Sequence, residues 1–177
     1  MRKPLKMKIS ERVASDCRSL GIYTNTNILV GMPGETKSDL EEGRENLKRI
    51  ETNWFNVVCA SPVVGSEMHE VSSEKGYIDV QNLGADYRTA TISTEDFSAE
   101  YIQEFQYKLN LELNFVRNQD IAKGEYKTAL IGFNNVIKLR PDHAFAHYHK
   151  ALAQTGLRAY SSAERTFLKY RELREAN

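Results

Sequence analysis

Two uncharged apolar runs, each followed by a turn rich in glycine and proline, constrain most strongly what this chain can fold into. The first covers residues 22–30 and is followed by Gly-Met-Pro-Gly-Glu; the second covers residues 54–61 and is followed by Pro-Val-Val-Gly-Ser. Both runs are rich in β-branched, aliphatic and aromatic residues. Because neither run carries a charge, each predicts a strand that is covered on both faces, as in a parallel sheet.

Helical patterns precede and separate these two strands. Residues 10–20 place apolar side chains at spacings of three and four and end before Gly21. Between the strands, Thr36 and Asp39 form a capping-box pattern, and Leu40 and Leu47 lie on one face of the helix that would follow. Alternation of helix and strand favours parallel strands joined by right-handed crossovers, an α/β arrangement.

The turn after the first strand has two interpretations. In parallel α/β folds the loops at the carboxyl ends of the strands line the ligand site, and glycines there let a ligand approach the backbone. In the alternative, the Gly-Pro-Gly segment only makes a tight turn, and Glu35 supports the start of the next helix. The spacing of the residues does not decide between the two.

The segment GIYTNTNILVGMPGETKSDLEEG at 21–43, followed by SPVVGSEMHE at 61–70, resembles the last part of the radical S-adenosylmethionine (radical SAM) enzymes. The resemblance is to the branch that often carries a cobalamin-binding domain upstream. It covers about residues 1–80, since the opening 22 residues are also similar to the stretch that precedes this motif. The resemblance implies that residues 1–92 are the C-terminal portion of a partial parallel βα (TIM-like) barrel, with the two runs as its fifth and sixth strands.

The same resemblance implies where S-adenosylmethionine would bind. In the family, backbone and apolar side chains near the ends of these strands contact the adenine. Carried over to this sequence, the contacts and the turn that shapes them are Leu29, Val30, Gly31, Gly34, Glu35, Ala60 and Ser61. The implied cofactors of the full-length protein are S-adenosylmethionine and a 4Fe-4S cluster, with cobalamin in an upstream domain of some members.

The chain departs from the family at the cluster. A C-x-x-x-C-x-x-C loop supplies the three thiolates in these enzymes, whereas this chain has only Cys17 and Cys59, far apart. We therefore expect no metal site and no catalytic residue within the chain, and no radical chemistry by the chain alone. Met1 is interpreted as an internal methionine of a longer protein or as the start of a truncated or split gene product. The missing N-terminal barrel portion is the expected partner.

The second half of the chain repeats at an offset of 34 residues, which is the period of the tetratricopeptide repeat (TPR). The aligned identities are Tyr126/Tyr160, Ala129/Ala163, Phe133/Phe167, Leu139/Leu173 and Arg140/Arg174. The sequence predicts a helical region over 93–177 with two TPR-like repeats, 110–143 and 144–177. A helix over 98–117, with its apolar stripe Ile102, Phe105, Leu109 and Val116, is expected to pack against the first repeat.

Three hypotheses of function follow. The first is a C-terminal fragment of a radical SAM enzyme that contributes the adenine-side wall, with the repeats binding a peptide or protein. The alternative is a stand-alone TPR interaction module whose α/β remnant is structural. The third is a nucleotide or phosphate binder that uses the turn at 31–36 and the helix after it. His143 and His147, one helical turn apart, are a weak metal candidate.

Composition bears on the cellular location and on nucleic-acid binding, but it does not indicate a reaction. The chain carries 24 basic and 24 acidic side chains, so no basic surface or recognisable module points to nucleic acid. No segment is long and apolar enough to span a bilayer and no signal peptide opens the chain, so we expect a cytoplasmic protein without a membrane partner.

Overall fold

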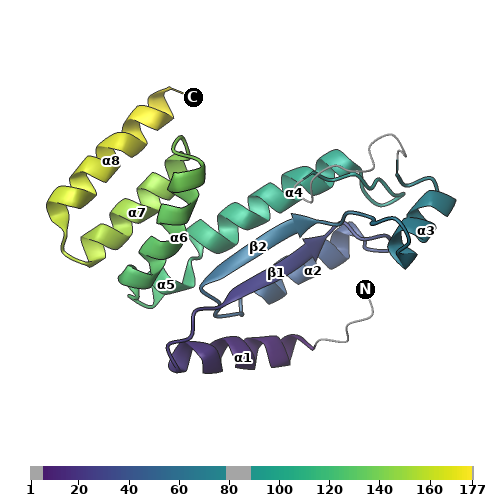
Figure 1. Cartoon of the computed structure of the whole chain (residues 1–177), viewed down its shortest axis with the longest axis horizontal. Helices are drawn as coiled ribbons and strands as arrows, with labels where there is room; N and C mark the ends of the chain where they lie inside the picture. Colours follow the sequence, from purple (N-terminus) through teal and green to yellow (C-terminus); the bar gives the residue numbers. More distant parts are fainter. Residues whose placement is uncertain (1–5, 79–88, 177) are drawn as a thin grey trace. The chain divides into compact units, whose positions relative to one another are not determined.

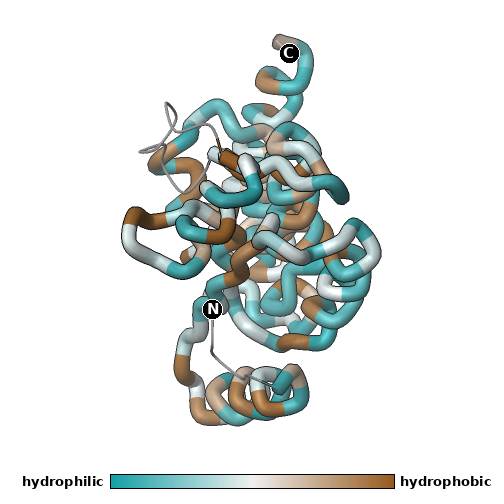
Figure 2. The backbone as a smooth tube through the Cα atoms, turned by 90° about the vertical axis from the view of Figure 1, so that its right-hand side faces the viewer, coloured by the Kyte–Doolittle hydropathy of each residue, from teal (hydrophilic) through white to brown (hydrophobic). Residues whose placement is uncertain are grey.

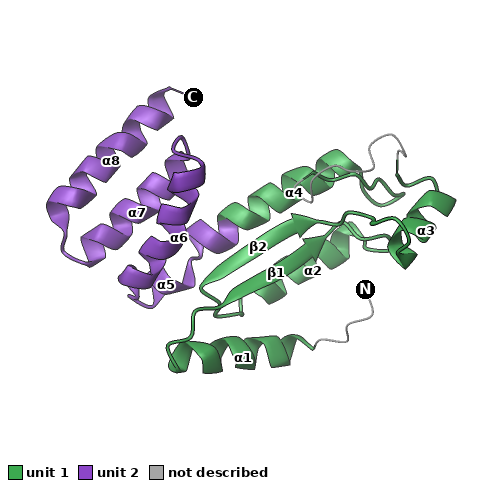
Figure 3. Cartoon of the chain, viewed as in Figure 1, with its two compact units in different colours: residues 1–111 green, residues 112–177 purple. Residues whose placement is uncertain are grey.

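A computed structural model describes residues 6–78 and 89–176 of the chain. The chain divides into two compact units, Met1–Leu111 and Glu112–Asn177 (Figure 3). The predicted division into domains 1–92 and 93–177 stays a prediction. The connecting segment expected at 79–94 lies largely outside the described residues.

The first unit contains a parallel pair of strands with a helix between them (Figure 1). β1 pairs with β2 in a register that sets Asn25 opposite Trp54 and Val30 opposite Cys59, which confirms the predicted parallel pairing. The elements of this unit are α1 (Met7–Ser19), β1 (Asn25–Val30), α2 (Lys37–Leu47), β2 (Trp54–Cys59), α3 (Glu67–Glu74) and α4 (Ala99–Leu111).

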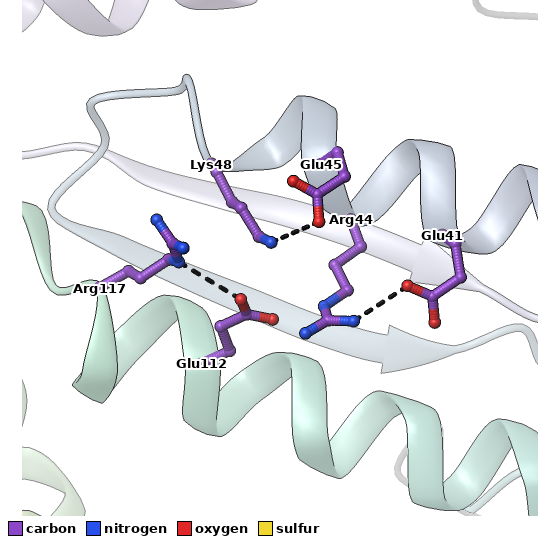
Figure 4. A network of polar contacts seen from close by, with 6 residues as sticks. All are labelled: Glu41, Arg44, Glu45, Lys48, Glu112 and Arg117. Atoms are coloured by element: carbon purple, nitrogen blue, oxygen red, sulfur yellow. Dashed lines mark hydrogen bonds and ion pairs between the residues drawn. The ribbon is translucent and has the colours of Figure 1, made fainter.

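The helices form for local reasons that the sequence already shows. Figure 2 shows hydrophobic and hydrophilic residues alternating around α1, at the bottom of the view. At the start of α2, the Asp39 backbone N–H donates to Thr36 Oγ1 at 3.2 Å and the Thr36 N–H donates to the Asp39 carboxylate at 2.9 Å, so the predicted capping box is confirmed. Two ion pairs form along α2 and just after it, Glu41–Arg44 and Glu45–Lys48; the Lys48 side chain is only 13% exposed (Figure 4).

The predicted partial barrel is wrong. The described residues contain one two-stranded sheet in an otherwise mostly helical chain, and two strands cannot curve into a barrel wall. The expectation that both faces of the strands are covered is also wrong. Phe55, Val57 and Cys59 are buried on one face, whereas Asn27 and Asn56 are exposed on the other.

The helix predicted over 98–117 is α4, which continues into a π-helical segment, η2 (Glu112–Val116). Its stripe was expected to pack against the first repeat, but Ile102, Phe105 and Leu109 are buried within the first unit, where α4 packs against β2. The Gln106 side-chain amide donates to the Val57 carbonyl at 2.6 Å, so the helix also satisfies a peptide group of that strand. The fourth member of the stripe, Val116, is 67% exposed.

The second unit is helical. After η2 it contains α5 (Gln119–Ala122), α6 (Tyr126–Leu139), α7 (Ala144–Gly156) and α8 (Tyr160–Glu175), with α6 against α7 and α7 against α8. Within it, Arg117 pairs with Glu112 at 3.3 Å (Figure 4). α6 and α8 begin at Tyr126 and Tyr160, the pair that the 34-residue offset aligns. The identification of these hairpins as TPR repeats stays a prediction.

Candidate functional site

The seven residues that the sequence singled out lie at the carboxyl ends of β1 and β2 and in the turn between β1 and α2. Leu29 and Val30 end β1, with Val30 buried, and Gly31 follows with a left-handed φ of 82°. Ala60 and Ser61 follow β2; Ala60 is buried and Ser61 is half-buried. Because the strands are parallel, both sets of residues lie at the same end of the sheet, where the two strands terminate.

Glu35 folds back over the turn that precedes it. The backbone N–H groups of Gly31 and Met32 donate to Glu35 Oε2 at 2.8 and 2.9 Å, and the Glu35 N–H donates to the Met32 carbonyl at 3.1 Å. Burial raises the pKa of the Glu35 carboxyl above its ordinary value, against the lowering effect of the two backbone N–H donors. The carboxylate therefore fixes the turn, while Thr36 and Asp39 cap α2.

Gly31 and Gly34 differ in what surrounds them. A Cβ added at Gly31 would lie 2.7 Å from Cγ2 of Ile102, so the absence of a side chain there admits α4. Gly34 also has a left-handed φ, of 89°, but nothing lies within 4 Å of a Cβ built on it. Of the two glycines, only Gly34 leaves its backbone open to a ligand on that side.

Two pockets of the first unit use these residues. One, of about 450 Å³, lies between the turn and the first turns of α3 and is lined by Met32, Pro33, Gly34, Glu35, Glu67, Met68 and Val71. The other, of about 390 Å³, runs along β1 between α2 and α4, and its walls include Leu29, Val30 and Glu35. Glu35 is shared by both pockets, whereas Gly31, Ala60 and Ser61 line neither of them.

The sequence interpretation missed the open face of the sheet. On that face the Asn56 amide N–H donates to the Asn27 amide oxygen at 3.1 Å, and both residues are exposed. Asparagine is disfavoured in strands, so its recurrence at 25, 27 and 56 was the signal that one face of these runs is not buried.

The chain's own residues do not fit a 4Fe-4S cluster. No group of three or more His, Cys, Asp and Glu side chains comes together among residues 6–78 and 89–176. Cys59 is 1% exposed on β2, and burial raises the pKa of its thiol to about 11, which opposes the thiolate that a cluster needs. Cys17 lies on α1. No step of chemistry is therefore assigned to a cluster held by these residues.

The histidines of the second unit use their ring nitrogens locally. His143 Nδ1 accepts from the Ala146 N–H at 3.1 Å at the start of α7, and His147 Nε2 lies 2.9 Å from the Pro141 carbonyl. These bonds direct the two rings to different backbone groups rather than to one ion.

The chain is similar in sequence to a methyltransferase. The chain is 26% identical over 128 residues to the cytidylyl-2-hydroxyethylphosphonate methyltransferase of Streptomyces wedmorensis. The match covers 67% of this chain and 24% of that protein, so the chain spans about a quarter of the length of the relative. No family model matches the chain. No helix within the described ranges is long and apolar enough to cross a membrane.

Proposed function

We propose that the first unit is part of a radical SAM methyltransferase and contributes residues that contact the adenine of S-adenosylmethionine. Two observations from the sequence support this: the strand-turn-helix motif at 21–43 with its second strand end, and the similarity to a methyltransferase. One structural observation supports the proposal most strongly. Hydrogen bonds to Glu35 fix the turn after β1 in a conformation that exposes the Gly34 backbone beside a pocket of about 450 Å³.

The residues of this pocket fit a purine better than a phosphate. Met32, Pro33 and Met68 give it an apolar wall on which a flat ring can stack. The carboxylates of Glu35 and Glu67 also line it and would repel a phosphate. The N–H groups of Gly31 and Met32, which could otherwise hold an anion, already donate to Glu35. The turn at 31–36 is therefore unsuited to a phosphate.

When bound, S-adenosylmethionine supplies the transferable methyl group. The part of this chain is to bind and orient: Met32, Pro33 and Met68 give the 450 Å³ pocket its apolar wall, and Leu29 and Val30 line the neighbouring pocket along β1. Ala60 and Ser61 lie at the end of β2 outside both pockets, and their contact with adenine rests on the resemblance alone. Gly34 admits the ligand, and Glu35 keeps the turn in one conformation. The cluster ligands and the remaining walls of the site come, in this proposal, from further polypeptide in the cytoplasm.

The place where that polypeptide would pair is the free edge of β1. The Trp54 N–H donates to Thr24 O and the Ala60 N–H donates to Val30 O, so the even-numbered residues of β1 face β2. Asn25, Asn27 and Leu29 thus direct their peptide groups to the other edge, where the described residues place no strand.

A second candidate function belongs to the second unit. Phe145 and Tyr148 are 43% and 36% exposed on α7, although aromatic side chains of this size are usually covered. This observation favours a binding surface for a peptide or protein, whether the first unit is catalytic or only structural. Capture of such a partner by the full chain, lost in a Phe145→Ala variant, tests it.

The proposed function is tested by a titration of the full ¹⁵N-labelled chain with S-adenosylmethionine, followed by two-dimensional NMR. We expect shifts of the Gly34, Glu35 and Ser61 amide signals, with a Kd of the order of 1 mM because only part of the site is present. Glu35→Ala should weaken binding about tenfold or more, and Glu74→Ala, on α3 outside the pocket, should not. Shifts confined to the second unit, or unaffected by Glu35→Ala, would contradict the proposal.

A further inference from the structure

His149 joins the exposed aromatic side chains of α7 to the core of the helical unit. Its ring centroid lies 5.5 Å from that of Phe115 and 5.9 Å from that of Phe133, the two stacked rings of the core. It lies 5.8 Å from the ring of Phe145 and 5.1 Å from the ring of Tyr148, which are the exposed aromatics of the helix. His149 itself is only 7% exposed. The exposed pair therefore rests on one buried histidine.

A bond to the backbone fixes which nitrogen of this ring carries the proton. His149 Nδ1 lies 2.8 Å from the Phe145 carbonyl oxygen. Because a carbonyl can only accept, Nδ1–H is the donor and the neutral ring has its lone pair on Nε2. A second proton would therefore be added at Nε2. Within residues 6–78 and 89–176 no acceptor is bonded to Nε2, so the new N–H would be unpaired among aromatic rings.

The side chains around the His149 ring are mostly uncharged. α7 packs against α6, α8 and η2 (Figure 1). The side chains that these elements bring toward the ring are aromatic: Phe133 from α6, Phe115 from η2, and Phe167 and Tyr170 of α8 behind Tyr148. Besides the tyrosine phenols, the titratable group that acts on the ring is His143, which stacks on Phe115 at 5.1 Å. Burial lowers the pKa of His149 below 6.5, the bond to the Phe145 carbonyl raises it by less, and His143 lowers it again.

A protonated His149 ring is therefore disfavoured where the neutral ring lies. Water stabilises an imidazolium, whereas here it would be enclosed by hydrocarbon rings with one N–H lacking an acceptor. Aromatic faces attract a cation, but the lowered pKa means that burial outweighs this attraction. Rotation of the side chain toward water would relieve the unfavourable burial. It would also remove the surface against which Phe145 and Tyr148 pack.

We propose that His149 is a proton-operated switch for the binding surface formed by Phe145 and Tyr148. With the ring neutral and buried, both aromatics are held in place and the surface can bind a peptide or protein. With the ring charged, it turns toward water, both aromatics lose their support, and the surface no longer binds. The control of binding rests on the second proposed function, whereas the movement of the ring does not. Because an exposed imidazole titrates at about pH 6.5, the buried form prevails above that value and is lost as the pH falls below it.

The test is a pH titration of the full chain with ¹³C-labelled His, Phe and Tyr rings, followed by two-dimensional NMR from pH 8 to pH 5. We expect the Phe145 and Tyr148 ring signals to shift with the midpoint of the His149 ring, below its ordinary value of 6.5. The nuclear Overhauser contacts between these rings should be lost together, while the ellipticity at 222 nm stays constant. In His149→Gln the shifts should be absent. His147→Gln removes a histidine that is bonded to the Pro141 carbonyl, and it should titrate as the parent does.

Three results would overturn the inference: a His149 midpoint at or above 6.5, Phe145 and Tyr148 signals that do not follow it, or a loss of ellipticity with the same midpoint, which would mean unfolding. If His149→Gln does not fold, Phe145→Ala carries the test. Removing a ring that covers His149 should move its midpoint upward, toward 6.5, and an unchanged midpoint would contradict the switch. Because the titration contains no partner, failure to capture a protein partner would remove the second proposed function alone.

Discussion

The two units of the chain differ in how completely their own side chains cover their hydrophobic cores. In the second unit Phe133 is 0% exposed, with the ring of Phe115 at 5.8 Å and that of His149 at 5.9 Å. In the first unit the sheet buries Phe55 and its neighbours on one face only, and leaves an amide-bearing face and one strand edge open. The helical unit thus builds its core from its own residues, whereas the α/β unit has surfaces that suit a ligand or another strand.

The largest expected effect is a loss of stability in the helical unit that leaves the first unit unchanged. Phe133→Ala should lower the free energy of unfolding of the helical unit by about 3–5 kcal/mol, because a filled aromatic site becomes a cavity. Far-UV circular dichroism in urea measures this, while Trp54 fluorescence follows the first unit in the same sample. Leu139→Ala, on the same helix at a 76% exposed position, is the control and should change little. A Trp54 transition that shifts as far as the helical one would mean that the units do not unfold separately.

A somewhat smaller effect is expected at the turn of the first unit. Gly31→Ala combines a left-handed backbone with a clash against Ile102 and should destabilise this unit by about 2–4 kcal/mol. In Gly34→Ala only the left-handed backbone is unfavourable, because no atom lies near the added Cβ. This variant should destabilise the unit by about 1–2 kcal/mol. Urea unfolding followed by Trp54 fluorescence gives both values. Equal losses of unfolding free energy in the two variants would show that a side chain at position 31 does not clash with Ile102.

An effect of about 1 kcal/mol is expected at two equivalent positions of the helical unit. Gly124 and Arg158, aligned by the 34-residue offset, both have left-handed φ angles, of 74° and 59°. Since only glycine takes this conformation freely, Arg158→Gly should stabilise the unit by about 1 kcal/mol, and Gly124→Ala should destabilise it by a similar amount. Thermal melts at 222 nm measure the difference. Destabilisation by Arg158→Gly would mean that contacts of the arginine side chain stabilise the unit by more than the left-handed backbone at this position destabilises it.

The smallest effect is a pH dependence in the helical unit. Burial lowers the pKa of His149, and likewise that of His143, below the ordinary value of 6.5. The unfolded chain therefore binds more protons than the folded chain as the pH falls below 6.5, and stability is lost in that window down to the folded pKa values. Arg140 and Asp142 flank His143 with opposite charges, and His147 lies one turn on. Melts at pH 7.5 and 5.5 should differ less for His149→Gln than for the parent chain.

Much of the local structure could be predicted from the sequence. The capping pattern of Thr36 and Asp39 and the parallel pairing of two uncharged runs follow from residue chemistry and spacing. These features depend on neighbours along the chain or on one crossover. The sequence signals that fix them are therefore complete within a short segment.

The tertiary arrangement could not be predicted in the same way. The stripe on α4 shows only that Ile102 must be buried, and both a repeat and a sheet can bury it; Gly31, whose missing Cβ admits Ile102, lies 71 positions earlier. The barrel was inferred from a resemblance, and nothing in the two runs themselves specifies additional strands. For the candidate site, the sequence pointed to the turn but left two roles open for Glu35; its carboxylate accepts from the backbone N–H groups of Gly31 and Met32 and so shapes the turn.

The central claim, that the turn after β1 contacts the adenine of S-adenosylmethionine, is tested most directly by photo-crosslinking. An azido-adenine analogue of S-adenosylmethionine is irradiated with the full chain, and the labelled tryptic peptides are identified by mass spectrometry. We predict labels in peptides 19–37 and 50–75, which contain the ends of β1 and β2, with competition by unlabelled S-adenosylmethionine. Labelling that falls mainly in the helical unit, or that unlabelled S-adenosylmethionine does not reduce, would contradict the claim.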